Sequence, residues 1–318
     1  MTDQEPLSVI IVNYNAGRHL AACIQSLMTN TPAVPMEIII VDNASMDDSI
    51  TRVRQAFPEV KILTNPENVG FAVACNQGIK RARGLNILLL NPDTIVLPYA
   101  VKDSLAFLSQ NPEAGIVGCR LLDNDGQPRN SCRTFPTAWD YLFDSLFLTK
   151  LFPRSKLFGR FYLTNTTFNE PSEVDVVQGA FFLFKRQVMD DIGLLDERFF
   201  MYAEERDFCY RAKAAGWKVY FYPQAAIVHV GSICTRQQAP EMFIEQHKST
   251  LIFHLKHDTL RDVAVIKVYL FLGVAIRLFI WTLLSIMRRR PGERSRQSIY
   301  LAVTRWYLAR GIHLGFPR

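Results

Sequence analysis

Short apolar runs alternate with amphipathic stretches over the first part of the chain. The apolar runs are too continuous to be half exposed, which predicts buried strands. Strands that alternate with helical stretches indicate a parallel sheet covered on both faces, so the fold class is α/β. We expect strands at Val9–Val12, Glu37–Val41, Val60–Thr64, Asn86–Leu90 and Gly115–Cys119, and helices near Arg18–Met28, Asp47–Phe57, Phe71–Arg83 and Tyr99–Ser109.

The pattern changes after Cys119. The Asp-Gly pair in Asp123–Gly126 predicts a hairpin turn, because glycine supplies the positive φ that such turns need. A calcium loop would require more ligands at alternate positions. Further along we expect an aromatic-rich cover at Trp139–Phe161, strands at Val174–Phe184, Trp217–Tyr222 and Ala225–His229, and a helix from Glu204 to about Ala215.

The C-terminal region contains a long apolar stretch. Val268–Met287 has Arg277 as its single charge and is long enough to span a bilayer. However, Lys267, Arg277, Ser285 and Arg288 share one side of a helical wheel, and Arg288–Arg290 follow. A charged stripe beside apolar faces favours a helix that lies in the membrane interface. A true span and a packed soluble helix remain the alternatives.

The charge of the chain is concentrated in this tail. The 318 residues carry a net charge of +6, yet from Glu241 onward 13 Lys and Arg face 5 Asp and Glu. The rest of the chain is slightly acidic, which argues against nucleic-acid binding. A basic, apolar tail suits an anionic membrane surface instead.

The cysteines and the N-terminus favour a cytoplasmic protein. Six cysteines are scattered without a C-x-x-C pair, which indicates buried thiols and not a disulfide framework. Met1–Pro6 is acidic and lacks the basic and apolar segments of a signal peptide. We therefore expect the main body of the protein in the cytoplasm.

Polar residues follow the first two predicted strands. Tyr14-Asn15 follows the first strand and Asp42-Asn43 the second, and the carboxyl ends of parallel strands are where open α/β sheets bind ligands. An aromatic ring stacks on a nucleobase, and a carboxylate accepts hydrogen bonds from a base or a ribose. Helix capping by Asn15, Asn43 or Ser45 explains the same pattern equally well.

A third motif, Asn91-Pro92-Asp93, follows the strand at Asn86–Leu90. The chain has neither G-x-G-x-x-G nor G-x-x-x-x-G-K-[ST], so a diphosphate needs another source of positive charge. Asp93 would lie in the ligand crevice, where hard divalent cations share carboxylates with substrate phosphates. A proline turn with a helix cap is the structural alternative.

The fourth motif is the pair Glu204-Glu205 at the start of a predicted helix. The helix dipole stabilises carboxylates there, and an Asp207–Arg211 pair adds support, so a charged first turn is one explanation. A positioned carboxylate is also what deprotonates an acceptor hydroxyl. His229, at the end of a short strand, is either a hydrogen-bonded core residue or a metal ligand beside Asp93.

In combination, these motifs resemble a family 2 glycosyltransferase of the GT-A fold, in the branch of bacterial rhamnosyltransferases and galactofuranosyltransferases. The resemblance covers about Ser8 to Ser232 and is specific as a combination. It is carried by Val12–Asn15, Val41–Ser45, Asn68–Phe71 with Asn76, Asn91–Asp93, Gly179–Phe182, Glu204–Arg211 and Pro223–His229.

The resemblance implies a role for each matching residue. Tyr14 and Asp42 would hold the nucleoside, Glu205 would be the catalytic base, and Asp93 with His229 would hold Mg²⁺ or Mn²⁺. The full implied set comprises nucleotide-sugar-binding Tyr14, Asn15, Asp42, Gly70, Asn76, Asn91 and Asp93, acceptor-side Gly179 and Ala180, catalytic Glu205 and Glu204, and metal ligands Asp93 and His229.

Two positions depart from the family pattern. Asn91 occupies a position that is acidic in many relatives, so Asp93 carries most of the metal-binding role. The base is usually the Asp of a Glu-Asp pair, whereas here Glu205 follows Glu204. Glutamate is one methylene longer, so which carboxylate reaches the acceptor stays open.

The implied reaction is an inverting transfer of a sugar to a glycan or lipid-linked acceptor in the synthesis of bacterial surface polysaccharide. The first choice of sugar is L-rhamnose, donated by dTDP-rhamnose. Alternatives are a galactofuranosyl- or other hexosyltransferase that uses a UDP-sugar, and a non-catalytic membrane-associated nucleotide-sugar-binding protein. We expect a catalytic domain at 1–239 and a helical, basic, membrane-associating region at 240–318. The expected location is the cytoplasmic face of the inner membrane, peripherally bound; homo-oligomer formation stays open.

Overall fold

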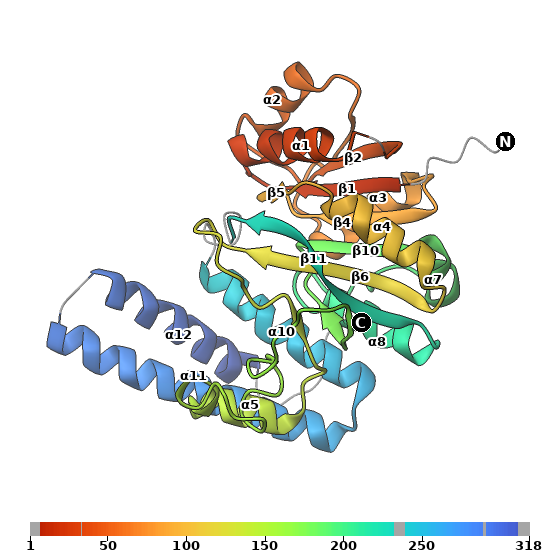
Figure 1. The fold of residues 1–318 in the computed structure, drawn as a ribbon. Coiled ribbons are helices and arrows are strands. Elements are labelled where there is room, and N and C mark those ends of the chain that lie inside the picture. The colour runs from red at the N-terminus through yellow and green to blue at the C-terminus, as the bar shows by residue number, and fades with distance from the viewer. Residues whose placement is uncertain (1–6, 33, 232–238, 289–290, 311–318) are drawn as a thin grey trace. The chain divides into compact units, whose positions relative to one another are not determined.

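The structure, a computed structural model, describes residues 7–32, 34–231, 239–288 and 291–310 (Figure 1). It divides into two compact units, each built from two stretches of the sequence. Unit 1 comprises Met1–Phe135 and Tyr162–Cys234, and unit 2 comprises Pro136–Phe161 and Thr235–Arg318.

Unit 1 is built on one nine-stranded sheet with the order β3-β2-β1-β4-β10-β6-β11-β5, to which β8 adds by pairing with β11. Strands β3, β2, β1 and β4 are mutually parallel, and β6 is parallel to β11, while β10, β5 and β8 run antiparallel to their neighbours. The bounds are β1 Leu7–Asn13, β2 Met36–Asp42, β3 Lys61–Thr64, β4 Asn86–Leu90, β5 Thr94–Val96, β6 Ala114–Leu122, β8 Ser172–Glu173, β10 Phe181–Lys185 and β11 Lys218–His229. A separate two-stranded sheet pairs β7 (Cys132–Arg133) with β9 (Val176–Val177).

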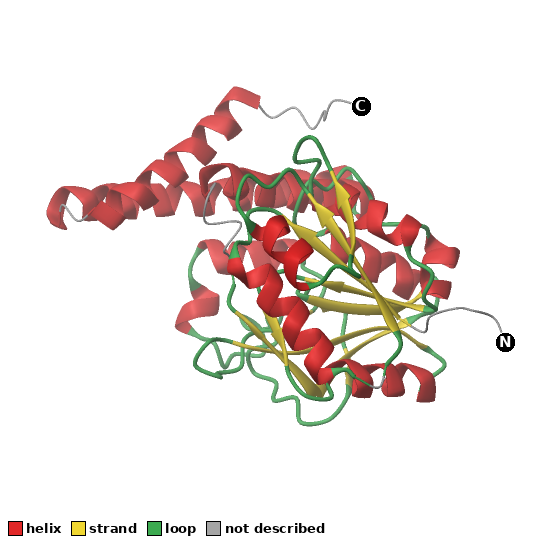
Figure 2. Cartoon of the chain, turned by 90° about the horizontal axis from the view of Figure 1, so that it is seen from above, coloured by secondary structure: helices red, strands yellow, loops and turns green. Residues whose placement is uncertain are grey.

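Apolar side chains on both faces of the strands explain why the sheet is covered on both sides. In β1, Val9 and Ile11 belong to one buried cluster, and Ile10 and Val12 belong to another, because successive side chains of a strand point to opposite faces. Figure 2 shows the strands flanked by helices. The first cluster includes residues of α1 (Arg18–Asn30), α2 (Ser49–Ala56) and α4 (Ala100–Gln110), and the second includes residues of α3 (Phe71–Arg81), α7 (Arg186–Ile192) and α8 (Glu204–Ala214).

The mostly parallel α/β architecture confirms the predicted fold class, with several differences in detail. The two strands expected at Trp217–Tyr222 and Ala225–His229 form one strand, β11, with an irregular register between Tyr222 and Ala226. Residues 176–185 form two strands, β9 and β10, separated at 178–180. The five cysteines within the described residues are buried free thiols, as predicted; Cys234 lies outside the described residues.

In its described residues, unit 2 contains five helices: α5 Ala138–Ser145, α6 Leu148–Leu151, α10 Ala239–His257, α11 Leu260–Arg288 and α12 Pro291–Arg310. The aromatic-rich segment that we interpreted as a cover forms α5 and α6, which pack with the C-terminal helices. Ser145 Oγ donates to the carbonyl of Tyr269 at 2.7 Å, and Tyr141 Oη lies 2.8 Å from His254 Nε2. The domains expected at 1–239 and 240–318 did not include this grouping of residues 136–161 with the C-terminal helices. The boundary between the two expected domains stays a prediction.

Polar side chains of helix α11 make contacts with other residues of unit 2. Arg277 Nη2 donates to Asp144 Oδ2 at 2.9 Å, and Ser285 Oγ lies 3.2 Å from Gln297 Oε1. Arg277 and Ser285 therefore do not belong to the interfacial stripe that the helical wheel predicted. The side chain of Arg288 and the residues Arg289 and Arg290 lie outside what the structure describes. Within the described residues, one stretch, Leu260–Met287, is long and apolar enough to cross a membrane, and its most apolar 18 residues have a mean hydropathy of 2.3.

Candidate active site

The carboxyl ends of β1 and β2 lie side by side because the two strands are parallel and in register. Asn13 pairs with Asp42 across the ladder. The backbone turns sharply after each strand, and the turns contain two non-glycine residues with positive φ, Asn15 at 50° and Ala44 at 65°. Such strained conformations persist where the surrounding structure holds them, and they cluster at functional sites.

Asn13 fixes the orientation of the Asp42 carboxylate. Its Nδ2 atom donates to Asp42 Oδ1 at 2.8 Å, and the hydroxyl oxygens of Ser45 and Ser49 each lie 2.9 Å from the same nitrogen. Asp42 is 7% exposed, so its carboxylate is held at the edge and not free in solvent. Asn13 is not among the predicted site residues, because its role follows from its place opposite Asp42 in the register of β1 and β2.

Tyr14 and Asn15 follow Asn13 directly, and the two side chains differ in environment. Asn15 Oδ1 accepts a hydrogen bond from the backbone N–H of Met46 at 2.7 Å, and the Asn15 N–H donates to Ser45 Oγ at 2.9 Å. The Asn15 side chain thus joins the two turns. Tyr14 is half-buried at the same edge.

Gly70 and Asn76 have structural contacts of their own. Gly70 has φ 88°, and an added Cβ would lie 2.7 Å from the carbonyl oxygen of Phe200. Asn76 is buried; its Nδ2 donates to the Leu195 carbonyl at 2.8 Å, and its Oδ1 accepts from the Leu195 N–H at 3.1 Å. Gly70 therefore permits the close approach of Phe200, and Asn76 holds the backbone of Leu195 in place.

Asp93 follows the carboxyl end of β4, the parallel neighbour of β1, and meets His229 at the end of β11. In the antiparallel pair of β5 and β11, His229 lies opposite Thr94, and the Val230 N–H donates to the Asp93 carbonyl at 3.0 Å. This register brings His229 Nε2 to 3.3 Å from Asp93 Oδ1. The carboxylate is buried and the imidazole is 17% exposed.

The predicted acceptor-side residues lie next to Asn91. The Asn91 N–H donates to the Ala180 carbonyl at 3.1 Å, which continues the antiparallel pairing of β4 and β10. Gly179 has no atom within 4 Å of where a Cβ would stand. A side chain at this position would enter open space beside the end of β4.

Glu204 and Glu205 begin α8 after two residues in the left-handed region. Tyr202 and Ala203 have φ of 71° and 63°. Glu204 is buried, and burial, then the charge of Glu205, raises the pKa of the Glu204 carboxyl well above its usual value. Among the described residues, the buried Oε2 atoms of both glutamates have no hydrogen-bond partner.

The start of α8 also shows part of the structural alternative, a charged first turn supported by an ion pair. Arg211 Nε donates to Asp207 Oδ2 at 2.8 Å, as the i,i+4 spacing predicted. Asp207 and Arg211 therefore serve the fold, since Arg211 also donates to the carbonyls of Ile192 and Leu194. Glu204 and Glu205 take no part in that network, and unpartnered buried carboxylate oxygens are costly unless a ligand or proton meets them.

A cavity of about 380 Å³ in unit 1 was not predicted. Among its lining residues, Arg120 Nη2 donates to the Phe168 carbonyl at 3.0 Å and Asn130 Nδ2 to the Tyr162 carbonyl at 2.6 Å. Arg129, also in the lining, lies against Gly231: a Cβ there would be 2.7 Å from Arg129 Nη1. The cavity thus approaches the backbone just beyond His229, and no motif pointed to these residues.

Residues 8–193, more than half of the chain, match the model of the family described as glycosyl transferase family 2. The chain belongs to this family. The matched region of this glycosyltransferase contains the Asp42 and Asp93 motifs, whereas Glu204, Glu205 and His229 lie beyond it.

Two curated relatives extend the comparison. The glycosyltransferase is 29% identical over 266 residues to the N-acetylglucosaminyl-diphospho-decaprenol L-rhamnosyltransferase of Mycobacterium tuberculosis strain H37Rv, which covers 80% of this chain and 84% of the relative. It is also 29% identical over 215 residues to the low-salt glycan biosynthesis hexosyltransferase Agl10 of Haloferax volcanii, covering 66% and 62% of the two chains. The predicted resemblance to rhamnosyltransferases is confirmed, and glycosyltransferase activity with a nucleotide-sugar donor is supported.

Solved structures confirm the GT-A fold. The mannosyltransferase PcManGT of Pyrobaculum calidifontis, in complex with GDP-Man and Mn²⁺, matches with a TM-score of 0.57 at 14% identity and covers 95% of this chain and 86% of that one. GalNAc-T7, with UDP, GalNAc and Mn²⁺, matches with a TM-score of 0.54 at 18% identity; 72% of this chain covers 44% of that enzyme. At these identities the likeness concerns the fold.

Proposed function

We propose that this protein is an inverting, metal-dependent glycosyltransferase that transfers L-rhamnose from dTDP-rhamnose to a glycan or lipid-linked acceptor of bacterial surface polysaccharide. The observation that carries the proposal is the approach of His229 Nε2 to Asp93 Oδ1 at the ligand-binding edge of a GT-A sheet. The sugar and the lipid-linked acceptor follow the mycobacterial relative, whose name gives both.

In this proposal Asp42 and Tyr14 bind the nucleoside. The Asp42 carboxylate is held in one orientation by Asn13, so it is prepared to accept hydrogen bonds from a base or a ribose. The half-buried Tyr14 ring offers a face for stacking. Asn15, Gly70 and Asn76 contribute by shaping the turns around the donor, given their contacts with neighbouring backbone.

Asp93 and His229 suit a divalent cation. Metal ligands at about 2.1 Å that stand at right angles to one another are about 3 Å apart, close to the 3.3 Å between Oδ1 and Nε2. A Mg²⁺ or Mn²⁺ ion held by these two residues would complete its coordination with phosphate oxygens of the donor. A bound ion would stabilise the charge that develops on the leaving diphosphate.

Glu205 is the proposed base. The raised pKa of Glu204 favours its protonated form, so Glu204 is the poorer proton acceptor of the pair. Glu205 is the more exposed of the two, and its Oε2 has no partner among the described residues. Glu205 would take the proton of the acceptor hydroxyl, while neutral Glu204 would avoid a second negative charge beside it.

Two features of unit 1 favour a binding place for the acceptor. Gly179 leaves open space, and its neighbour Ala180 accepts a hydrogen bond from the Asn91 N–H at the end of β4. The cavity near Arg129 and Asn130 approaches the chain beyond His229 and offers polar groups for sugar hydroxyls. We assign the acceptor glycan to this region.

Membrane association is proposed for the C-terminal region, at the cytoplasmic face of the inner membrane and without a span. The exposed apolar residues of α11 recur at helical spacing, which places them along one face. An apolar face of this kind enters the headgroup region of an anionic bilayer, and the basic tail strengthens the attraction. The residues are Val265, Val268, Leu272, Phe279, Leu283 and Ile286.

A UDP-hexose donor is the second candidate, because Agl10 is named as a hexosyltransferase. The same experiment tests both. Purified full-length protein is incubated with an N-acetylglucosaminyl-diphospho-lipid and dTDP-rhamnose, UDP-galactofuranose or other UDP-hexoses, with Mn²⁺ or with a chelator. We expect a rhamnosylated lipid by mass spectrometry, only with the metal, and an inverted anomeric centre by NMR. Transfer from a UDP-sugar alone would support the second candidate, and binding without transfer from any donor would contradict both.

A further inference from the structure

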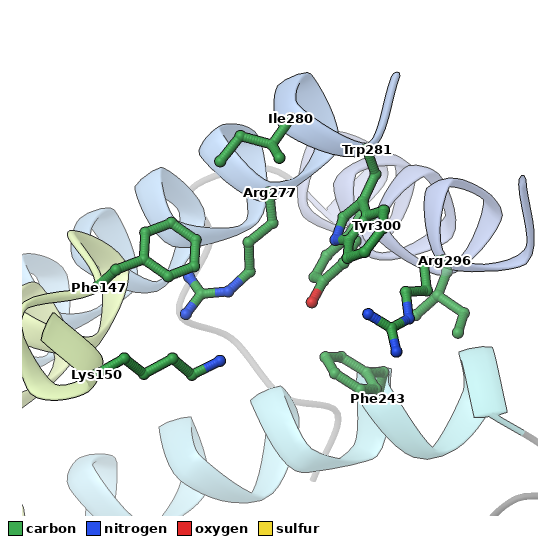
Figure 3. A pocket seen from close by; sticks show the side chains of 9 residues that line it. Phe147, Lys150, Phe243, Arg277, Ile280, Trp281, Arg296 and Tyr300 are labelled. Carbon is green, nitrogen blue, oxygen red and sulfur yellow. The ribbon is translucent and has the colours of Figure 1, made fainter. Parts of the chain in front are cut away.

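Unit 2 contains a cavity of about 530 Å³ that combines cationic and aromatic side chains. Figure 3 shows Lys150, Arg277 and Arg296 extending into it from α6, α11 and α12, with the Tyr300 hydroxyl pointing to the same space. The rest of the lining is apolar and comes from Phe147, Phe243, Ile280, Trp281 and Ile299.

The cations are held by rings as well as by charge. The Arg296 guanidinium lies 4.6 Å from the centre of the Trp281 ring, and the Arg277 guanidinium lies 4.5 Å from that of Phe147. Lys150 Nζ lies 5.9 Å from the same Phe147 ring. Guanidinium groups that stack on aromatic rings keep their edges available for hydrogen bonds, which is how proteins present arginine to phosphate groups.

The cavity carries an excess of positive charge. Arg277 is paired with Asp144, but neither Lys150 nor Arg296 has a carboxylate partner among the described residues. His247 adds no charge at neutral pH, because burial and then Arg277 lower its pKa to about 4. Three cations against one carboxylate favour an anionic ligand.

Apolar surface adjoins the cations. Leu146 and Leu151, next in sequence to Phe147 and Lys150, are 42% and 67% exposed. A free inorganic anion would use only the polar part of such a site, whereas a molecule with an anionic head and an apolar chain would use both.

We propose that this cavity binds the phosphorylated head of a lipid, with Lys150, Arg277, Arg296 and the Tyr300 hydroxyl donating to phosphate oxygens and the aromatic residues contacting the start of the chain. Two sources share this chemistry, a prenyl diphosphate and an anionic phospholipid. The inference deepens the membrane association proposed above and rests on it, but it does not depend on the transfer reaction.

Monomeric lipids test the site without a membrane. Full-length protein, in buffer with a chelator, is titrated calorimetrically with farnesyl diphosphate and, separately, with dihexanoyl phosphatidylglycerol, both below the concentration at which they aggregate. We expect saturable binding of at least one, weakened about tenfold by Lys150→Gln or Arg296→Gln, as expected for the loss of a charged hydrogen bond. Arg305→Gln, an exposed arginine of the same helix α12, is the matched control and should bind as wild type.

The identity of the lipid that binds distinguishes the two sources. Equal binding by wild type, Lys150→Gln and Arg296→Gln would overturn the proposal. Binding of farnesol as tightly as farnesyl diphosphate, or of inorganic diphosphate as tightly as either lipid, would overturn it as well. Asp93→Asn protein should bind the lipids like wild type, so failure of this site and failure of the transfer reaction are separable.

Discussion

His229 Nε2 lies 3.3 Å from Asp93 Oδ1, although the two residues are far apart in sequence. The contact follows from the topology: β11 returns to the sheet beside β5, and the register sets His229 opposite Thr94. The two residues do not belong to one helix, strand or turn, so local structure alone would not bring them together. The pair is therefore a product of the fold, and it is the part of the site on which metal binding depends in our proposal.

Replacing either member of this pair should weaken metal binding. We expect Asp93→Asn and His229→Gln each to reduce Mn²⁺ affinity in the presence of dTDP by more than about tenfold. Substitution of a residue that only hydrogen-bonds to a metal ligand already costs about tenfold or more, and loss of a ligand itself should cost at least as much. Mn²⁺ electron paramagnetic resonance measures the free ion directly. Asp125→Asn, at an exposed aspartate of unit 1, should leave the affinity unchanged. Wild-type affinity in both variants would refute the assignment.

Glu204 should make stability depend on pH. Its pKa is raised in the folded state, so the folded protein holds this proton to higher pH than the unfolded chain does. The contribution of Glu204 to stability is fully present below about pH 4.5, its unfolded pKa, and is lost as the pH rises through the raised value. Glu204→Gln removes that loss and should raise Tm by a few degrees at pH 8, with the gain shrinking toward pH 4.5.

Thermal unfolding of wild type and variant at several pH values measures this effect. Glu59→Gln, at an exposed glutamate of unit 1, is the control and should show no pH-dependent difference. A Tm for Glu204→Gln that is lower than wild type at pH 8 would show that the ionised carboxylate is stabilised by contacts and not destabilised by burial.

The sheet of unit 1 was predictable because its strands are local apolar runs. Val9–Val12 and Asn86–Leu90 were recognised within a few residues of β1 and β4. The two-residue strands β7 and β9 were not separable from their surroundings, because they exist only through pairing with one another. The grouping of 136–161 with the C-terminal helices also depends on long-range contacts, such as that of Ser145 with Tyr269.

The residues of the candidate site could be predicted from sequence motifs, but the hydrogen bonds between them could not. Asp42 could be named because it ends an apolar strand, whereas the role of Asn13 depends on a register that the sequence does not state. Asn76 illustrates the converse: the resemblance implied a binding residue, and its amide is bonded to Leu195. Whether it also affects the donor stays a prediction.

Asn76→Ala should destabilise the protein. It leaves the buried N–H and carbonyl of Leu195 without their partner, which costs about 1–3 kcal/mol for each unsatisfied group. Denaturant unfolding measures the loss, and Lys80→Ala, at an exposed residue of the same helix, is the control. If Asn76 acts by positioning, the donor dissociation constant of the folded variant should change little; unchanged stability with lost donor binding would indicate direct contact.

The exposed face of α11 should control membrane binding. Phe279 is 64% exposed and Leu283 45%, so Phe279→Glu with Leu283→Glu should leave the fold intact. We expect the double variant to remain in the supernatant when wild type sediments with vesicles containing phosphatidylglycerol, because the carboxylates remove apolar area from the face and are repelled by the anionic lipid. Phe279→Leu should sediment like wild type. Equal sedimentation of the charged variant would exclude this face as the contact.

The most direct test of the account is the turnover number for sugar transfer by Glu205→Gln, compared with Glu204→Gln and wild type at saturating donor, acceptor and metal. General base catalysis contributes about 10²–10⁴-fold to rate, so Glu205→Gln should lose at least about 10²-fold in kcat while its donor affinity is retained. Glu204→Gln, which keeps the neutral form that burial favours, should retain most of the activity. Near wild-type turnover by Glu205→Gln, or a greater loss in Glu204→Gln, would contradict the proposed assignment of the base.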